Sequence, residues 1–176
     1  MKEETMPTLP LERDETLALR WPPDASPPPP PDLPRGYTLR VGVDRAAFAS
    51  TQAAIGFEVT DAAWSRLVEQ LAAGAMVFAE TTDTHEPVAV AAAEHCADGW
   101  VEPGWVAVAP VHRGAGLGLA VCTALTRHLL SHGHHRLIGS TQDHRLAALR
   151  IYLTLGFQPV LRPEKAARWQ AVMLQV

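Results

Sequence analysis

Apolar and polar positions follow regular periods from residue 37 onward, and these periods predict a mixture of strands and helices. Residues 37–43 alternate as in a half-buried strand, and Asp44 stands where a helix through residue 54 needs its N-terminal cap. A second helix is predicted from Thr60, because apolar residues then recur at helical spacing until Gly74. Three strands follow at 75–80, 88–94 and 100–109, the last interrupted by a bulge or kink at Pro103-Gly104.

The last third of the chain shows the same alternation of elements. A helix is predicted over residues 116–132, with one apolar face and Gly133 as its terminator. A strand at 136–141, a helix at 145–155 and two strands near 157–161 and 169–174 complete the pattern. Helices that alternate with strands and hairpins predict a mixed α/β sheet with helices on both faces.

The first 36 residues have a different composition. Eight of the fifteen prolines lie between Trp21 and Pro34, and proline fits neither a helix interior nor a sheet interior. We therefore predict an extended or disordered arm at 1–36, within which Leu17–Trp21 could dock on the domain, and one folded domain at 37–176.

Composition narrows the class of protein. Apolar residues make up 47% of the chain, yet no apolar run approaches the roughly 20 residues of a membrane span, and the N-terminus is polar. We therefore expect a cytoplasmic protein without a membrane partner, in which the widely spaced Cys96 and Cys122 are buried thiols. The net charge of −4 argues against nucleic acid as a partner and is compatible with a cationic amine.

One segment carries a clear chemical signal. An apolar strand runs through residues 106–109 into Pro110, then into Arg113-Gly-Ala-Gly-Leu-Gly118 and directly into an amphipathic helix. Glycines at alternate positions let a ligand approach the backbone closely, and the N–H groups lie at the positive end of the helix dipole. This arrangement predicts an anion site that suits a phosphate or diphosphate.

Other phosphate-binding patterns do not fit this spacing. The phosphate loop of nucleotide hydrolases needs a lysine after its glycines, and none follows here. The dinucleotide pattern G-x-G-x-x-G fails because, counted from Gly114, its third glycine is Leu119. A glycine-rich turn without any ligand is the remaining alternative.

Two motifs resemble the GNAT superfamily of acyltransferases. Val108-x-Pro110-x-x-Arg113-Gly-x-Gly116-x-Gly118 resembles the family's R-x-x-G-x-G/A signature, and residues 148–157 resemble its A-x-x-L-Y-x-x-L-G-F helix and turn. The resemblance covers about residues 105–157. It implies a mixed, mostly antiparallel sheet that is splayed at its central strands, with the pantetheine arm of acetyl-CoA lying in the split.

The resemblance also implies roles for individual residues. Tyr152 would protonate the departing thiolate, although a half-buried core tyrosine is the alternative. Arg145 stands where the family often has an asparagine that contacts the cofactor, and it could reach a phosphate instead. The family's usual strand carboxylate is missing, so Glu102 is the first candidate for the base, followed by Glu94 and His95. The residues implied to bind the cofactor are Val106, Ala107, Val108, Arg113, Gly114, Ala115, Gly116, Leu117, Gly118 and Arg145.

The implied function is an N-acetyltransferase in which a primary amine attacks acetyl-CoA directly in a ternary complex. A non-catalytic acyl-CoA-binding module and a nucleotide-binding switch are alternatives. The acceptor, a small-molecule or peptide amine, is not specified by the sequence, although Phe57, Trp64 and Trp105 could line its site. We expect no metal, because no cysteine completes a site with His128 and His132, and a homodimer is a possible assembly.

Overall fold

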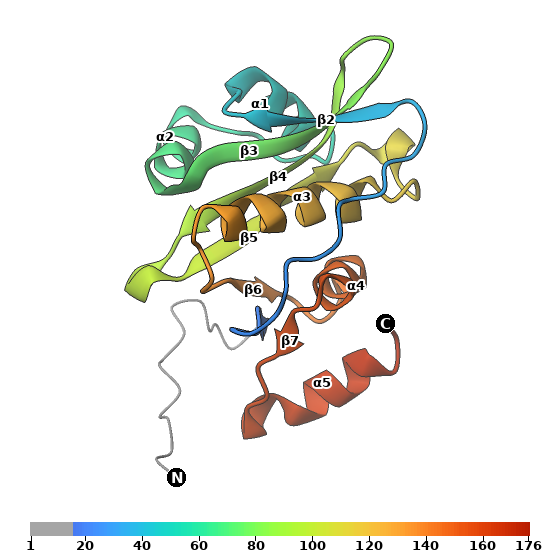
Figure 1. Ribbon diagram of the computed structural model, residues 1–176. Coiled ribbons are helices and arrows are strands. Elements are labelled where there is room, and N and C mark those ends of the chain that lie inside the picture. Colours follow the sequence, from blue (N-terminus) through green and yellow to red (C-terminus); the bar gives the residue numbers. More distant parts are fainter. Residues whose placement is uncertain (1–15) are drawn as a thin grey trace.

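The computed structural model describes residues 16–176, which form two antiparallel sheets with helices on both sides (Figure 1). The larger sheet has the order β2 (Tyr37–Gly42), β3 (Leu71–Thr81), β4 (Pro87–His95) and β5 (Val101–Val108). The smaller sheet has the order β6 (Ile138–Thr141), β1 (Leu17–Arg20) and β7 (Gln158–Pro159). The predicted mixed α/β class is confirmed.

The two sheets separate between β5 and β6. The start of β5 meets the segment just before β6 at an isolated parallel bridge between Val101 and Leu137, where the Val101 N–H donates to the Arg136 carbonyl at 2.9 Å. In the described part of the chain, β5 beyond this bridge is paired with β4 alone. The edge of β5 that faces β6 is therefore open, as expected for a sheet splayed at its central strands.

Helices cover both faces of the larger sheet (Figure 1). On one face, α1 (Arg45–Ala53) and α2 (Asp61–Gln70) supply Phe48 and Leu67 to a core that contains Met76 and Phe78 of β3. The alternate residues of β3 join a second core with α3 (Leu117–Ser131) and α4 (Leu146–Leu155). This division follows from the two-residue period of a strand. No helix among residues 16–176 has the length and apolar character needed to cross a membrane.

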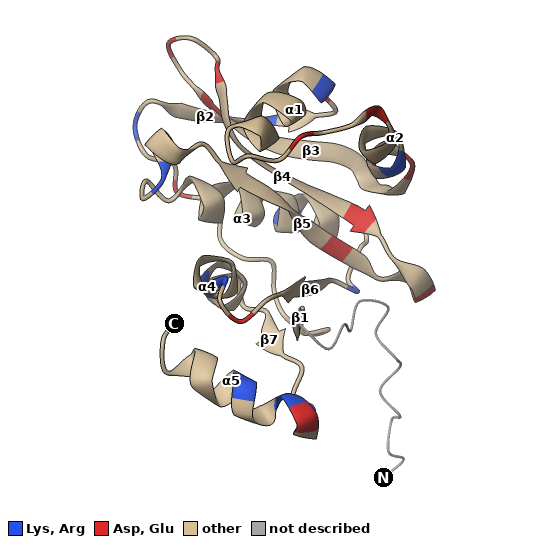
Figure 2. Cartoon of the chain, turned by 180° about the vertical axis from the view of Figure 1, so that it is seen from behind, with Lys and Arg blue, Asp and Glu red and all other residues tan. Residues whose placement is uncertain are grey.

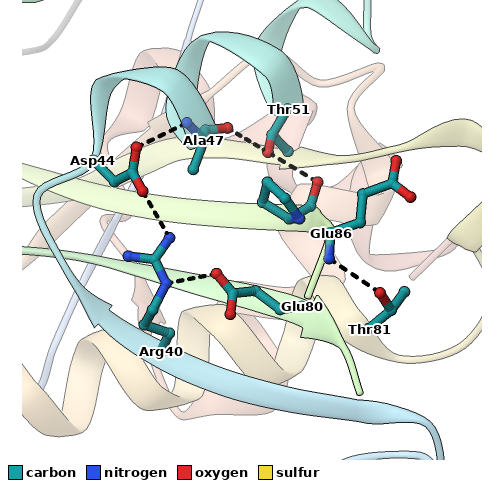
Figure 3. A network of polar contacts seen from close by, with 8 residues as sticks. Arg40, Asp44, Ala47, Thr51, Glu80, Thr81 and Glu86 are labelled. Atoms are coloured by element: carbon teal, nitrogen blue, oxygen red, sulfur yellow. Dashed lines mark hydrogen bonds and ion pairs between the residues drawn. The ribbon is translucent and has the colours of Figure 1, made fainter. Parts of the chain in front are cut away.

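A polar network anchors the start of α1 to the edge of the sheet (Figure 3). The Asp44 carboxylate caps the helix by accepting from the Ala47 N–H at 3.0 Å, as its position in the sequence predicts. Arg40 of β2 donates to Asp44 at 3.0 Å and to Glu80 of β3 at 2.5 Å. The cap bond, followed by Arg40, holds the pKa of Asp44 below its usual value.

The second predicted helix ends earlier than Gly74. It stops at Gln70, and β3 begins at the next residue with an irregular stretch in which Ala73 and Gly74 have φ values of 55° and 61°. Pairing with β4 shifts register between Leu71 and Met76. Gly74 is thus part of a bulge within β3 and does not end the helix.

The arm predicted at 1–36 is in part an element of the domain. Residues Leu17–Arg20 form β1, the middle strand of the smaller sheet, with Leu17 opposite Thr141 and Leu19 opposite Pro159. Leu17 and Leu19 are fully buried, and Trp21 is buried against Phe157. A domain boundary at residue 37 is therefore too late for this strand, because apolar side chains on both of its faces are covered. Residues 1–15 lie outside the described residues.

The proline-rich segment leads from β1 to β2 along the outside of α3 (Figure 1). It is free of helix and strand from Trp21 to Pro34, as its composition predicts. The Arg127 guanidinium of α3 donates to the carbonyl of Pro28, and residues 28–34 line a cavity together with parts of α3 and α4. This segment is therefore extended and docked.

The C-terminal segment is a helix, not the strand predicted near 169–174. Residues Ala166–Met173 form α5, with Trp169 and Val172 buried three positions apart on one side. Two physical reasons account for the difference. The alanines and glutamine of this segment favour a helix, and β1 already occupies the place in the sheet between β6 and β7.

We expect Trp21→Ala to destabilise the whole domain by about 3–5 kcal/mol, because it removes a buried indole from beside Phe157 and leaves a cavity. Chemical denaturation of the full chain measures this change. Asp24→Ala, an exposed position of the same segment, is the control and should shift the free energy of unfolding by no more than about 0.5 kcal/mol. Equal stability of Trp21→Ala and wild type would show that the segment is not part of the folded unit.

We expect Asp44→Ala to lower the free energy of unfolding by about 1 kcal/mol at pH 7, through loss of the helix cap. Asp44→Asn keeps a capping oxygen and should lose less. Because the pKa of Asp44 is lowered in the folded state, its charge stabilises the fold above the unfolded pKa near 4, and this advantage disappears as the pH falls through the folded value. Denaturation at pH 7 and pH 3 should show the gap between wild type and Asp44→Asn closing in acid.

Candidate functional site

A bulge in β5 shapes the open edge of the larger sheet. Ala92 pairs with Gly104 and Val90 with Ala107, so β5 carries one extra residue in this interval. Trp105 in the bulge has a φ of 51°, a conformation that non-glycine residues seldom adopt. The Gln52 side chain of α1 holds it by donating to the Trp105 carbonyl at 2.9 Å. Sequence reasoning missed Gln52, which lies in an ordinary amphipathic helix without a motif.

The glycine-rich loop contains glycines in left-handed conformations and leads to backbone N–H groups that no capping side chain binds. Gly114 and Gly116 have φ values of 82° and 83°, and a Cβ added to either would meet no atom within 4 Å. Gly116 caps α3 without a side-chain acceptor, so no side chain occupies the N–H groups of the first turn. These donors stand at the positive end of the helix, in open space. The loop can therefore bind an anion such as a diphosphate.

A groove of about 450 Å³ connects this loop with the open edge of β5. Of the ten residues implied to bind the cofactor, eight line this groove. Ala115 lines the neighbouring cavity under residues 28–34, and Arg145 lines a different cavity. The remaining wall comes from α4 and from Ile55 and His112, which no motif had indicated. The eight are Val106, Ala107, Val108, Arg113, Gly114, Gly116, Leu117 and Gly118.

A second cavity, of about 250 Å³, lies in the split between β5 and β6. It contains Tyr152, Glu102 and Arg145 together, which are far apart in the sequence. Val106 lines both this cavity and the groove, so the two spaces are neighbours on either side of this residue of β5. The other lining residues are Glu94, Gly104, Trp105, Ser140 and Thr141.

Tyr152 is a buried residue whose hydroxyl crosses the split. It projects from α4 and donates to the Pro103 carbonyl of β5 at 2.5 Å. Its ring lies flat against Gly139 of β6, where an added Cβ would be only 2.8 Å from two ring carbons. Burial is the largest cause that raises the pKa of Tyr152 well above its usual value, and electrostatic interaction with Cys122 and with the Glu102 carboxylate adds to it. The hydroxyl is thus a proton donor at neutral pH.

The packing behind Tyr152 reaches the N-terminal segment. The Tyr152 ring meets Phe157 edge-on at 5.2 Å between centroids, and Phe157 meets Trp21 in the same way at 5.3 Å. Trp21 therefore supports the position of Tyr152 through one intervening ring, although its own side chain lies outside the cavity.

The carboxylates suggested as bases occupy the cavity, whereas the histidine does not. Glu102 accepts from the Ser140 hydroxyl at 2.9 Å, and Glu94 accepts from the Trp105 indole at 2.7 Å. The ring of His95 instead lies 5.2 Å from that of His134, away from the cavity lining. Figure 2 shows acidic residues on adjoining parts of β4 and β5, at the end of these strands near β6.

Aromatic residues border the bulge on the side of α1 and α2. Trp105 meets Phe57 and the buried Phe48, both at 5.7 Å between ring centroids. Trp64 of α2 is half-buried, packs on Phe48 and is not a lining residue of the cavity. Of the aromatic residues suggested for an acceptor wall, the structure brings Phe57 and Trp105 together and places Trp64 against Phe48.

Histidines cluster at the end of α3. The rings of His128 and His132 are 4.1 Å apart, and the His132 ring contacts the His128 carbonyl. Across residues 16–176, no group of three or more histidine, cysteine, aspartate or glutamate side chains is placed to hold a metal ion.

Solved structures with a similar fold are acetyltransferases. A GCN5-related N-acetyltransferase from Sphaerobacter thermophilus has a TM-score of 0.64 and 23% identity, over 82% of this chain and 48% of that one. A tandem GNAT protein from the clavulanic acid biosynthesis pathway has a TM-score of 0.59 and 17% identity, over 82% and 50%. The ribosomal-protein-S18-alanine N-acetyltransferase from Escherichia coli has 0.55 and 18%, over 68% and 76%. The chain thus spans about half the length of the first two.

The sequence itself assigns the family. Comparison with curated proteins gives no significant match. The sequence profile of the Acetyltransferase (GNAT) family matches residues 42–157, which include the bulged strand, the glycine-rich loop and Tyr152. Because this match covers about two thirds of the sequence and agrees with the splayed sheet, the chain belongs to the GNAT acetyltransferase family.

Proposed function

We propose that the protein is an N-acetyltransferase that moves an acetyl group from acetyl-CoA to a primary amine by direct attack in a ternary complex. The observation that carries the proposal is that the groove and the cavity are neighbours with a shared wall residue. The groove leads from the glycine-rich loop along β5 to Val106, and Val106 also borders the cavity that contains Tyr152 and Glu102.

The groove matches the parts of the coenzyme in order. The diphosphate would bind the backbone N–H groups of residues 113–118 at the start of α3. The amides of the pantetheine arm would pair with Ala107 and Val108 on the open edge of β5, as a peptide does when it extends a sheet. The thioester would then reach the bulge, where backbone donors can stabilise its carbonyl oxygen as negative charge develops.

The reaction needs one base and one proton donor. The amine nitrogen forms a bond with the acetyl carbon, and the tetrahedral intermediate loses the coenzyme sulfur as its C–S bond breaks. Glu102, directly or through water, takes the proton that the amine loses, and Tyr152 supplies a proton to the sulfur. Return of the proton from Glu102 to the Tyr152 oxygen restores the site, so the products are the amide and coenzyme thiol.

The environment of Tyr152 defines how it can act. Its raised pKa keeps the hydroxyl protonated, but it also makes full release of the proton unfavourable before the reaction. We propose that the hydroxyl leaves the Pro103 carbonyl and donates to the sulfur as charge builds there, since hydrogen bonds to an ionised acceptor are the stronger ones.

Substitution of Gly116 should weaken binding of acetyl-CoA selectively. In Gly116→Ala the new Cβ projects into the open space of the loop, and the left-handed backbone is strained by about 1 kcal/mol. Gly133→Ala is a matched control, because Gly133 has a φ of 82° at the other end of the same helix. We expect similar losses of stability in both variants but at least a tenfold higher Kd for acetyl-CoA in Gly116→Ala only, measured by calorimetry. Equal affinities in the two variants would place the diphosphate elsewhere.

Tyr152→Phe should lower kcat by about 100-fold without changing the Kd for acetyl-CoA, because it removes one general acid and keeps the ring. The assay is amine-dependent release of coenzyme thiol. In the wild type, kcat should not fall on the alkaline side up to about pH 10, since burial holds the tyrosine pKa above that value.

Two results would contradict this mechanism. An unchanged kcat in Tyr152→Phe would remove the hydroxyl from the reaction. Tight binding of acetyl-CoA without thiol release from any amine would identify a non-catalytic acyl-CoA-binding module instead.

A further inference from the structure

The cavity in the split between β5 and β6 contains charges of opposite sign that do not neutralise each other. Glu94 and Glu102 line one part of it, and Arg145 at the start of α4 lines another. Across residues 16–176, the Arg145 guanidinium forms no hydrogen bond or ion pair, so it is not bound to either carboxylate.

The structure explains why these charges remain separate. Glu94 is held by the Trp105 indole at 2.7 Å, and Trp105 is fixed in turn by Gln52. Glu102 accepts from Ser140 at 2.9 Å. The Trp105 indole and the Ser140 hydroxyl are neutral donors, so these two hydrogen bonds orient the carboxylates without transferring a charge to them.

The backbone of Arg145 is also held in place by hydrogen bonds. Its carbonyl accepts from the N–H groups of Ala148 and Leu149 in the first turn of α4. Asp143, the acidic residue nearest to it in sequence, is already bound by Arg168 of α5, with 2.7 Å between Nε and Oδ2. The guanidinium therefore stands at the cavity without an acidic partner.

The negative charge of the carboxylates affects another group nearby. Burial first, and then Glu102 and Glu94, raise the pKa of the Cys96 thiol to about 11. The part of the cavity that these glutamates line is thus suited to a cation, and the part that Arg145 lines is suited to an anion.

We propose that the acceptor is a zwitterion that carries an ammonium and a carboxylate group, a small amino acid or the amino-acid end of a larger molecule. Glu94 and Glu102 attract its ammonium group beside Tyr152, and Arg145 binds its carboxylate. The ammonium group releases one proton to water before the neutral amine attacks the thioester. This inference rests on the proposed function, because it names the amine that the reaction consumes. The cavity volume of about 250 Å³ lies below that of sites for drug-sized ligands, which agrees with a small acceptor.

The role proposed here for Arg145 differs from the one that the family resemblance implied. The resemblance to the family suggested that Arg145 could reach a coenzyme phosphate. Arg145 does not line the groove at the glycine-rich loop, and it shares its cavity with Glu94, Glu102 and Tyr152. Its guanidinium, which can bind a carboxylate through two parallel hydrogen bonds, therefore serves the acceptor.

The test compares acceptors that differ only by a carboxylate. Glycine, β-alanine and γ-aminobutyrate are assayed beside methylamine, ethylamine and propylamine, with acetyl-CoA and detection of thiol release. We expect kcat/KM for the best amino acid to exceed that of its matched alkylamine by about 10- to 100-fold, as expected for one hydrogen-bonded ionic contact. Arg145→Ala should bring this ratio close to one, and Arg145→Lys should recover part of it.

Two control variants separate the carboxylate contact from other effects. Arg66→Ala, an exposed arginine of α2 outside the cavity, should leave the ratio unchanged. Glu94→Gln keeps an oxygen for the Trp105 indole and should weaken both members of each pair equally, because both carry the ammonium group.

Distinct results would overturn this inference and the proposed function. A ratio near one in the wild type, or a ratio that Arg145→Ala does not change, would exclude Arg145 as the carboxylate site. If Arg145→Ala raised the Kd for acetyl-CoA tenfold and left the ratio of kcat/KM values unchanged, Arg145 would be a residue that binds the coenzyme. Calorimetric titration of the amino acids into the complex of the protein with coenzyme A measures their affinity in the absence of turnover. Binding that depends on Arg145 but gives no thiol release would support the zwitterion site and reject catalysis.

Discussion

The open edge of β5 is the constraint on which the site depends. Backbone donors and acceptors that lie away from water need partners. Among the described residues, the segment just before β6 pairs with β5 at a single bridge, between Val101 and Leu137. Pro103 has no N–H group that would need a partner on this edge, and its carbonyl accepts a hydrogen bond from the Tyr152 hydroxyl. The rest of the edge is available to a ligand that brings amides of its own, which is the chemistry of a pantetheine arm.

The structural features around this edge either keep it open or set its direction. The bulge at Trp105 redirects the strand, and Gln52 holds the bulge from the opposite layer of the fold. The glycine-rich loop begins α3 just beyond the end of β5, so its donors lie along the same line as the strand edge. Gly139 lets the ring of Tyr152 lie directly on β6, and a larger residue there would push the hydroxyl away from β5. The site is therefore a product of backbone geometry, with few side chains taking part.

Sequence reasoning succeeded where local pattern determines structure. The cap at Asp44, the bulge near Gly104 and the helix that begins at Leu117 all follow from residues close together in the chain. It failed where distant segments compete for one position. Leu17–Arg20 becomes a strand because β6 and β7 need a partner between them, and residues 166–173 become a helix where a strand had been predicted.

The same division holds for the candidate site. The loop and Tyr152 could be found because glycines and a tyrosine at fixed spacing form motifs. Gln52 and Ser140 could not, since each acts through one contact with a residue far along the chain. Arg145 was named from its spacing to Tyr152, but its neighbours Glu94 and Glu102 could be placed only once the strands were positioned.

The middle position of β1 has a consequence for how the chain reaches its folded state. Its partners are residues 138–141 and 158–159, more than a hundred positions later, so this sheet closes over one of the longest loops that the chain can form. During synthesis, Leu17 and Leu19 would remain exposed to water until residues 138–159 had been made. The proline-rich segment that follows this strand would then act already during synthesis, because it keeps the unpaired strand extended and separate from the larger sheet.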